Sequence, residues 1–473
     1  MQKIKIGLFS IGLDTYWPQF SGLLDRLLGY HKEISDKIAE FGVSVVDAGM
    51  VDNIKLADSA AQKFKQEDVD LIFLFISTYA LSSTVLPVVQ KANKPVVVLN
   101  LQPVSSIDYD AFNSLGDRGK MTGEWLAHCQ ACSVPEIASV FNRSGIDYHL
   151  VTGYLEDETA WREIGNWIDA AKVRKTLSNT KVGLIGNYYN GMLDVYSDLT
   201  QQQAAFGNSY EILEVSELKS FRDSITEEEI EEKIKQFRSE FKVSDECEPY
   251  ELERAAKTSC ALDKIVSEKE LGAIAYYFEG KGDADYEDIL TSIIAGCSTL
   301  TGNNIPVAGE YEVKNVQAMK IIDSFNCGGS FSEFYLMDFD DDVVLLGHDG
   351  PVHSGIAEGE VGLVPLPVYH GKPGKGLSMQ MTVKHGPVTI LSVVQNREGE
   401  VFFLVAEGES VPGPVLEIGN TNSRYRFSIG AREFVNNWSK AGPAHHCAIG
   451  IGHISDKIDK LGALLKIAVN RIC

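Results

Sequence analysis

The sequence lacks long apolar runs and basic character. It contains no stretch of 18 apolar residues, which excludes a transmembrane helix because a span needs about 20 predominantly apolar residues. Its net charge of −23 argues against binding to nucleic acid or to an anionic membrane surface, since both need a basic face. Neutral or cationic ligands and divalent metal ions remain compatible with so acidic a chain.

Cysteine is also scarce, with eight residues scattered along 473 positions, so we expect no disulfide framework. Cys129 and Cys132 form a C-x-x-C in "HCQAC", and no second such pair exists. A zinc site would need that second pair, and a redox pair would need thiols of lowered pKa. We therefore interpret both cysteines as small buried residues on or near a helix.

Two other absences concern phosphate binding and targeting. No G-x-x-x-x-G-K-[ST] motif appears, and the nearest segment, "GKPGKG", lacks its spacing, which argues against a phosphate-cradling enzyme. The opening "MQKIKIGLFSIGLDTYW" has only a short apolar run and no small-residue cleavage site. We expect it to be a first β-strand of a cytoplasmic protein.

The first third of the chain alternates strand-like and helix-like segments. Residues 70–77 ("DLIFLFIS") and 94–100 ("KPVVVLN") are apolar runs, as expected for strands buried on both faces of a parallel sheet. Residues 3–10 also favour a strand, and residues 29–42 favour a helix that Gly42 ends. This βαβ order predicts a doubly wound α/β layer.

A second alternating unit follows. Residues 180–192 and 272–280 favour strands, whereas residues 286–302 favour a helix. The charged segment 225–241 predicts another helix, with Thr226 as its N-cap and acidic residues in its first turn. We interpret its run of acids as a solvated helix face.

Glycine and proline become frequent in the last third of the chain. β-rich runs there cover residues 387–395, 400–408 and 423–430. They predict an antiparallel barrel-like sheet, and residues 455–472 favour a last helix with Ser455 as its N-cap. The expected fold is α/β, with two doubly wound parallel-sheet domains followed by a β-barrel-like antiparallel C-terminal domain. The expected domain boundaries are 1–175, 176–326 and 327–473.

Histidine is scarce too, yet three of the ten lie within nine positions in "AGPAHHCAIGIGHIS". Such a cluster suits either the polar edge of a core or one wall of a metal site. Four segments in all place acidic or histidine side chains at strand ends or in Gly-rich turns, where side chains converge. These side chains are Glu310, Glu333, His348, His445 and His446. Two carboxylates and two imidazoles can bind a divalent ion such as Mn²⁺, although each residue alone equally suits a hydrogen-bonded core position.

The order and context of these segments resemble the L-arabinose isomerase / L-fucose isomerase superfamily. Bacterial arabinose isomerases carry segments like "GEGDWK", "GGTSFMEDY", "LVLGSHM" and "GGAHHT", and this chain has "GEYEVK", "GGSFSEFY", "VLLGHDG" and "GPAHHC" in the same order. Upstream, residues 149–171 are similar to the family's "VVTGHWQD…RIGSWMRQA" stretch, and residues 186–195 to its "GDNMREV" loop. The resemblance spans roughly residues 100–460.

The resemblance implies the same order of domains as the pattern above. It implies that Mn²⁺, or another divalent metal, is bound by Glu310, Glu333, His348 and His446. It makes His445 a substrate contact or a support of the ligands, and His453 structural. It also implies a homo-oligomer, a hexamer or smaller, with sites near subunit interfaces.

The implied activity interconverts an aldose and its ketose through a cis-enediolate whose two oxygens are bound to the metal. Glu310 and Glu333 would serve as general base and general acid, with the assignment left open. The residues expected to contact the sugar are His445, Gln130, Tyr16, Trp17 and Tyr335.

The sugar-recognition segments depart from the family. Where arabinose isomerases have a "NQTAHGGREFG"-like segment, this chain reads "HCQACSVPEIA", so Gln130 matches the glutamine but a substrate-contacting histidine is replaced. Tyr16 and Trp17 stand where a "GSQHLYG"-like turn has a glutamine and a histidine. L-arabinose is therefore the leading substrate, and an anionic aldohexose such as sulfoquinovose is the alternative. Its sulfonate would need a basic pocket, for which the candidates are Arg143, His149, Lys372 and Lys375.

Two other classes of function remain open. A sugar-binding module would share two doubly wound domains, but the extra β-rich domain with its Glu and His residues argues against it. A metal-dependent hydrolase or aldolase would use the same four ligands with an activated water. The expected partner is a small-molecule sugar, with neither nucleic acid nor membrane.

Overall fold

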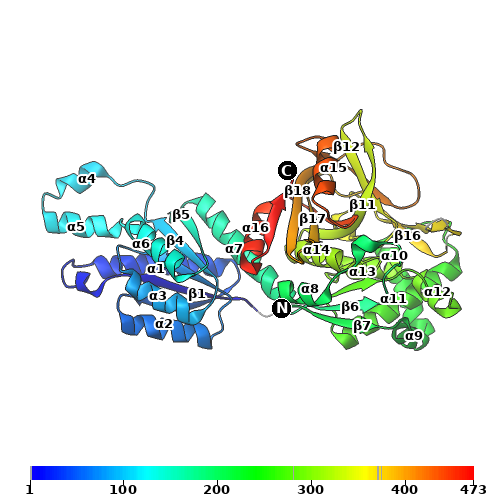
Figure 1. The fold of residues 1–473 in the computed structure, drawn as a ribbon, viewed down its shortest axis with the longest axis horizontal. Helices are drawn as coiled ribbons and strands as arrows, with labels where there is room; N and C mark the ends of the chain where they lie inside the picture. Colours follow the sequence, from blue (N-terminus) through cyan, green and yellow to red (C-terminus); the bar gives the residue numbers. More distant parts are fainter. Residues whose placement is uncertain (1–2, 281, 370–371, 374) are drawn as a thin grey trace. The chain divides into compact units, whose positions relative to one another are not determined.

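The computed structural model describes residues 3–280, 282–369, 372–373 and 375–473 (Figure 1). The chain forms two compact units, Met1–Lys175 and Thr176–Cys473. Each contains a parallel sheet, and the second also contains an antiparallel barrel, which confirms the predicted fold class. A division of the second unit at residues 326 and 327 stays a prediction. No helix in the described part of the chain combines the length and apolar character needed to cross a bilayer.

The first unit is built on a five-stranded parallel sheet in the order β2-β1-β3-β4-β5. Its strands are β1 (Lys5–Ile11), β2 (Ser44–Val51), β3 (Leu71–Ile76), β4 (Val96–Gln102) and β5 (Tyr148–Tyr154). Every side chain of β3 is buried, because helices cover both faces of the sheet. This explains why its sequence, LIFLFI, is continuously apolar instead of alternating.

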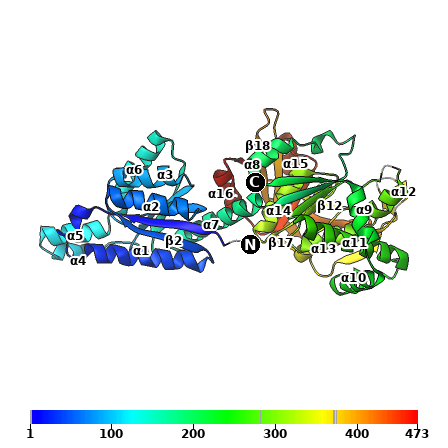
Figure 2. The same cartoon turned by 90° about the horizontal axis from the view of Figure 1, so that it is seen from below.

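The helices of this unit lie on both sides of the sheet. They are η1 (Asp14–Tyr16), α1 (Leu23–Glu40), α2 (Ile54–Gln66), α3 (Ser82–Ala92), α4 (Tyr109–Ser114), α5 (Arg118–Ala127), α6 (Gln130–Ser144) and α7 (Glu158–Ser178). Helices α2, α3 and α6 share one core with the strands through Phe64, Val88 and Phe141, and α1 lies on the opposite face (Figure 2). The unit is therefore doubly wound.

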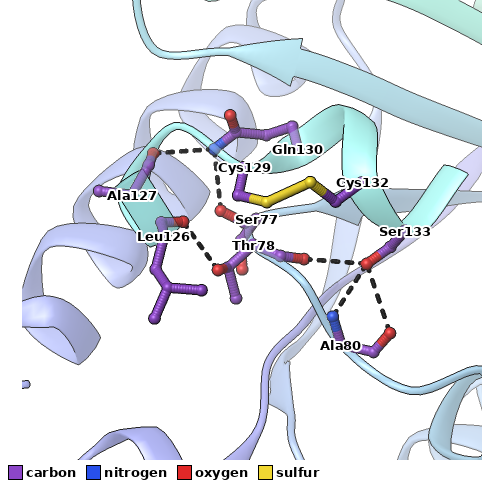
Figure 3. Close-up of a disulfide and its surroundings, with 9 residues drawn as sticks. All are labelled: Ser77, Thr78, Ala80, Leu126, Ala127, Cys129, Gln130, Cys132 and Ser133. Atoms are coloured by element: carbon purple, nitrogen blue, oxygen red, sulfur yellow. Dashed lines mark hydrogen bonds between the residues drawn. A yellow bond between two sulfur atoms is a disulfide. The ribbon is translucent and has the colours of Figure 1, made fainter. Parts of the chain in front are cut away.

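Cys129 and Cys132 are joined by a disulfide at the start of α6 (Figure 3). The prediction of two unlinked buried cysteines is wrong, because the bond is present and Cys132 is exposed. Cys129 is the N-cap of α6, and Cys132 follows one turn later on the same helix face. Their Cα atoms lie 5.6 Å apart, a separation that a disulfide spans.

The second unit begins with a four-stranded parallel sheet in the order β10-β9-β6-β7. Its strands are β6 (Lys181–Ile185), β7 (Ser209–Leu213), β9 (Ala273–Tyr276) and β10 (Val307–Ala308). The helices around it are η2 (Leu193–Val195), α8 (Leu199–Phe206), α9 (Val215–Asp223), α10 (Glu227–Glu240), α11 (Pro249–Lys269), α12 (Ala284–Leu290), α13 (Ile294–Gly302) and α14 (Val313–Ser324). The predicted capping of α10 is confirmed, since Thr226 and Glu229 form a capping box.

The helix predicted over residues 286–302 is two helices, α12 and α13. The hydroxyls of Thr291 and Ser292 donate hydrogen bonds to backbone carbonyl oxygens of the preceding turn, at Glu287 and Asp288. Helix α12 ends with Thr291 as its C-cap, and α13 begins with Ile293 as its N-cap.

Six antiparallel strands close into a barrel in the order β17-β20-β11-β12-β19-β18, because β18 also pairs with β17. They are β11 (Gly328–Asp338), β12 (Val343–His348), β17 (Gly386–Gln395), β18 (Val401–Val411), β19 (Thr421–Phe427) and β20 (His446–Ile451). Helix α14 packs against the barrel at β17 (Figure 2). The other elements are β8 (Lys242–Val243), η3 (Ser354–Ile356), β13 (Gly362–Pro365), β14 (Val368–Tyr369), β15 (Lys372–Pro373), β16 (Leu377–Gln380), α15 (Ala431–Lys440), α16 (Ser455–Leu465) and β21 (Ala468–Arg471).

The prediction that the last helix extends to residue 472 is wrong. Helix α16 ends at Leu465, and Lys466 adopts a left-handed conformation with φ of 59°. Residues 468–471 then form β21, which pairs in parallel with β18. The apolar spacing over residues 466–472 suits a helix or a strand, and the free backbone edge of β18 decides between them.

Candidate metal centre

The structure brings five of the predicted site residues together in the second unit. Glu310, His348 and His446 are buried and offer ligand atoms that all lie within 4.8 Å of one another. Glu333, His445 and His446 form an overlapping group of the same size. A buried carboxylate with two imidazoles is a donor set that can hold a divalent metal ion.

Glu310 enters this cluster from the turn that follows β10. Glu310 and Tyr311 are both left-handed, with φ of 57° and 58°. Two consecutive non-glycine residues in this region carry strain, which the surrounding structure must overcome. The Tyr311 N–H donates to the Tyr276 carbonyl oxygen at 2.7 Å and the Glu312 N–H donates to the Gly309 carbonyl oxygen at 3.1 Å. The turn thereby brings Glu310 and Glu312 to two different nitrogens of His446.

His446 is held with one nitrogen facing Glu310. Its Nδ1 donates to Glu312 Oε2 at 2.9 Å, and both side chains are fully buried. In a neutral ring that donates from Nδ1, Nε2 carries a lone pair, and here Nε2 lies 3.5 Å from Glu310 Oε2. Neither of these two buried atoms has a hydrogen-bond partner among the described residues. Two buried acceptors that face one another are costly unless a cation lies between them, so the residues fit a bound metal.

His348 is the last residue of β12, and its position is also fixed. The Gly350 N–H donates to His348 Nδ1 at 2.7 Å, and Nε2 lies 3.9 Å from Glu310 Oε1. A cavity of about 10 Å³, the size of one water or ion, opens beside these groups. The contact with Gly350 keeps the proton of a neutral ring on Nε2. Nε2 of His348 and Nε2 of His446 therefore both face Glu310.

Glu333 comes from β11, where it is paired directly with His446 across the sheet. Burial raises the pKa of Glu333, and the nearby carboxylates of Glu310 and Asp349 raise it further. Burial also acts to raise the pKa of Glu310, but interactions with the imidazoles of His445, His446 and His348 lower it to about 2. The environments of the two carboxylates thus push their pKa values apart, as in many acid–base pairs.

His445 also faces the carboxylates of Glu310 and Glu333. Asp194, in η2, accepts hydrogen bonds from the His445 backbone N–H at 2.9 Å and from Nδ1 at 2.6 Å. Nε2 then lies 3.5 Å from Glu310 Oε2 and 4.0 Å from Glu333 Oε2. Burial acts to lower the pKa of His445, but its interactions with Glu310 and Asp194 raise it to about 9. The two adjacent histidines therefore have different surroundings.

Lys314 links the supports of the two histidines. Its Nζ donates to the Asp194 carbonyl oxygen at 2.7 Å and lies 3.6 Å from Glu312 Oε1. Asp194, Glu312 and Lys314 are therefore site residues that the sequence analysis missed. Glu312 and Lys314 lie in the "GEYEVK" segment, where alternate charges that face a buried site give a weak signal. Asp194 gives no signal of its own.

Loss of the negative charge behind His446 is expected to weaken metal binding. Glu312→Gln keeps the volume of the side chain but removes its negative charge. That charge makes His446 a stronger metal ligand, so the Mn²⁺ affinity should fall about 10-fold. Calorimetric titration of metal-free protein measures this, with Glu409→Gln, on an exposed face of β18, as the matched control. An unchanged affinity in Glu312→Gln would contradict the assignment.

Tyr335 also lies at this site, on β11. Its hydroxyl accepts a hydrogen bond from Asn420 Nδ2 at 2.8 Å, and the same nitrogen donates to Asp349 Oδ1 at 2.6 Å. Burial raises the pKa of Tyr335 far above its ordinary value, and the carboxylates of Asp349 and Glu333 add to the shift. The phenol is therefore neutral. Asn420 and Asp349 are two further residues that the sequence analysis did not single out.

The other predicted sugar contacts lie in the first unit. Gln130 is fully buried, and its side-chain nitrogen donates to the carbonyl oxygens of Ser77 and Ala127 (Figure 3). Tyr16 packs edge-on against Trp17, whose indole nitrogen donates to Asp52 at 2.7 Å. Their sugar-binding roles, and the homo-oligomer that would use them, stay predictions.

The four predicted cationic contacts are scattered. Arg143 is exposed on α6, and the ring of His149 packs against Trp167 with centroids 4.1 Å apart. Lys375 is exposed. The side chain of Lys372 lies outside the described part of the chain, as do His370, Gly371 and Gly374 of the same segment.

The sequence comparisons find similarity to L-arabinose isomerases. A family model described as the L-arabinose isomerase central domain matches residues 193–285. The L-arabinose isomerase of Nocardioides sp. is 24% identical over 348 residues, which cover 70% of this chain and 68% of that one. The L-arabinose isomerase of Klebsiella pneumoniae is 23% identical over 369 residues, covering 75% and 71%, and that of Shewanella baltica is 25% identical over 365 residues, covering 72% and 70%.

Among solved structures, a glucose-galactose binding protein from Geobacillus stearothermophilus aligns at 13% identity over 66% of this chain and 96% of that one. Its TM-score of 0.17 is too low to establish a shared fold. The sequence matches instead cover both the central segment and most of the chain's length. The chain is similar to L-arabinose isomerases over most of its length, and its central segment matches the model of their central domain.

Proposed function

We propose that this protein is a metal-dependent aldose–ketose isomerase. The observation that carries the proposal is the pair of unpartnered buried atoms, His446 Nε2 and Glu310 Oε2, beside a second carboxylate of raised pKa, Glu333. The relatives that bear the name L-arabinose isomerase support the reaction class. Mn²⁺ bound by Glu310, His348, His446 and Glu333 would supply a Lewis acid that polarises the sugar carbonyl.

The chain's own residues would move two protons. Isomerisation of an aldose transfers one proton from C2 to C1 and another from O2 to O1. Glu333 is suited to accept the carbon proton and return it, because a base works best when its pKa lies near the operating pH. Glu310 stays ionised and serves as a ligand.

His445 is the residue that we assign to the oxygen proton. Its Nε2 faces the same space as both glutamates, and Asp194 holds the ring in place. Tyr335, Gln130, Tyr16 and Trp17 complete the proposed sugar contacts. L-arabinose is the leading substrate, with sulfoquinovose or another anionic aldohexose as the alternative.

An aldose-to-ketose assay tests the proposal. EDTA-stripped protein is incubated with and without Mn²⁺ on L-arabinose, D-galactose, L-fucose, D-glucose and sulfoquinovose. Mn²⁺-dependent formation of a ketose from any of these establishes the isomerase and names its substrate. Sugar binding without conversion, in protein that holds one metal ion per chain, would favour a binding protein and contradict the proposal.

Asp194 is expected to affect turnover without affecting metal binding. Asp194→Asn removes the charge that orients His445, so kcat should fall about 10-fold, while Glu312 still orients His446 and the Mn²⁺ affinity stays the same. A double-mutant cycle with His445→Ala tests whether Asp194 affects turnover through His445. If Asp194 acts through His445, Asp194→Asn has no further effect in the His445→Ala background. Additive losses would refute this coupling.

A further inference from the structure

Asp349 is a carboxylate residue of the site, and the proposed mechanism does not use it. It follows His348 directly at the end of β12, is half-buried, and lines the same small cavity as Glu310 and His348. Its Oδ1 accepts the hydrogen bond from Asn420. No other hydrogen bond or ion pair to Asp349 occurs among the described residues, so Oδ2 is left without a partner.

The surroundings hold this carboxylate in one position. Asn420 is buried and donates from a single nitrogen to both Asp349 and Tyr335. Asn422 in turn donates to Asn420 Oδ1 at 3.4 Å, which fixes the amide orientation. Because the Tyr335 oxygen accepts from Asn420, its own O–H remains able to donate. Asp349 therefore offers a negatively charged hydrogen-bond acceptor, and Tyr335 beside it offers a neutral hydrogen-bond donor.

The cavity beside Asp349 is lined by acidic, aromatic and glycine residues together with His348. The cavity lining contains no lysine or arginine within the described ranges. Asp349 instead stands near Glu333 and Glu310, and like charges at close range oppose one another. A fixed, unpaired acceptor of this kind suits a neutral donor such as a hydroxyl group, and it repels a sulfonate, phosphate or carboxylate at the same point.

We propose that Asp349 accepts a hydrogen bond from a substrate hydroxyl close to the metal-binding end of the sugar and is a specificity-determining residue. The site then requires a neutral, hydroxylated carbon at that position. This inference rests on the proposed isomerase function.

The test combines one substitution with deoxy sugars. Asp349→Asn is compared with native protein on the aldose that is converted best and on its 3-, 4- and 5-deoxy analogues. We expect kcat/KM for the full sugar to fall about 10- to 100-fold, the range for a hydrogen bond to a charged group. For one analogue, which lacks the hydroxyl in question, the substitution should have little further effect. Equal losses on the full sugar and on every analogue would overturn the inference.

A binding measurement supplies a readout without turnover. Calorimetric titration of the Mn²⁺-loaded protein with the alditol of the preferred sugar should give about 10-fold weaker binding for Asp349→Asn than for native protein. Asp340→Asn, the same chemical change at an exposed position on the β11–β12 turn, is the control and should behave as native. Equal alditol affinities for Asp349→Asn and Asp340→Asn would overturn the inference, even if every native assay shows isomerase activity. Absence of any converted aldose would instead overturn the proposed function.

Discussion

Glu333→Gln is expected to lower kcat by about 10²- to 10⁴-fold, the usual contribution of a general acid–base group. The amide keeps the shape of the side chain but cannot take up a proton. Burial, with the charges of Glu310 and Asp349, raises the pKa of Glu333, and a carboxyl of raised pKa is better suited to take up and return a proton. The assay is made at saturating Mn²⁺, so that a weaker metal affinity does not contribute to the loss.

Glu310→Gln serves as the comparison for this result. It should also abolish turnover, but it should lower the Mn²⁺ affinity as well, because Glu310 Oε2 faces His446 Nε2 across the proposed metal position. Thermal unfolding of both variants controls for folding, and each should unfold near the native temperature. Retained turnover in either variant would contradict the catalytic role assigned to that glutamate.

His446→Ala is expected to lower the Mn²⁺ affinity by more than about 100-fold, beyond the 10- to 100-fold typical of residues that only support a ligand. The reason is that Glu312 holds His446 with Nε2 facing Glu310. His348→Ala should have a smaller effect, since Nδ1 of His348 faces the Gly350 N–H and not a carboxylate that would strengthen the ligand. Metal content after dialysis and calorimetric titration both measure the difference.

His453→Ala is the matched control for this experiment. His453 lies in the same stretch of sequence, but its Nε2 hydrogen-bonds to the Gly408 carbonyl oxygen at 3.0 Å and takes no part in the cluster. It should leave the Mn²⁺ affinity unchanged. Unchanged affinity in His446→Ala, with loss in His445→Ala, would exchange the roles of the two adjacent histidines.

The sequence was sufficient for the features that depend on local pattern. The apolar run in β3 predicts a strand with both faces covered, and Thr226 predicts the start of α10. Where the pattern was compatible with two structures, the prediction was wrong. Residues 466–472 continue a helical spacing, yet they form β21 because β18 offers a free edge. Residues 286–302 form two helices, α12 and α13, in place of one.

The candidate ligands were also visible from the sequence, because Glu310, His348 and His446 stand at the ends of strands that must converge. What supports them could not be seen. Asp194 meets His445 across 251 positions and Glu312 meets His446 across 134. Contacts of this kind depend on the strand register that pairs Glu333 with His446 and on the left-handed turn at Glu310. The sequence by itself determined which elements form and which residues can bind a metal, since both follow from residue type and spacing. Only the tertiary structure decided which charge faces each ligand, because that depends on contacts between distant segments.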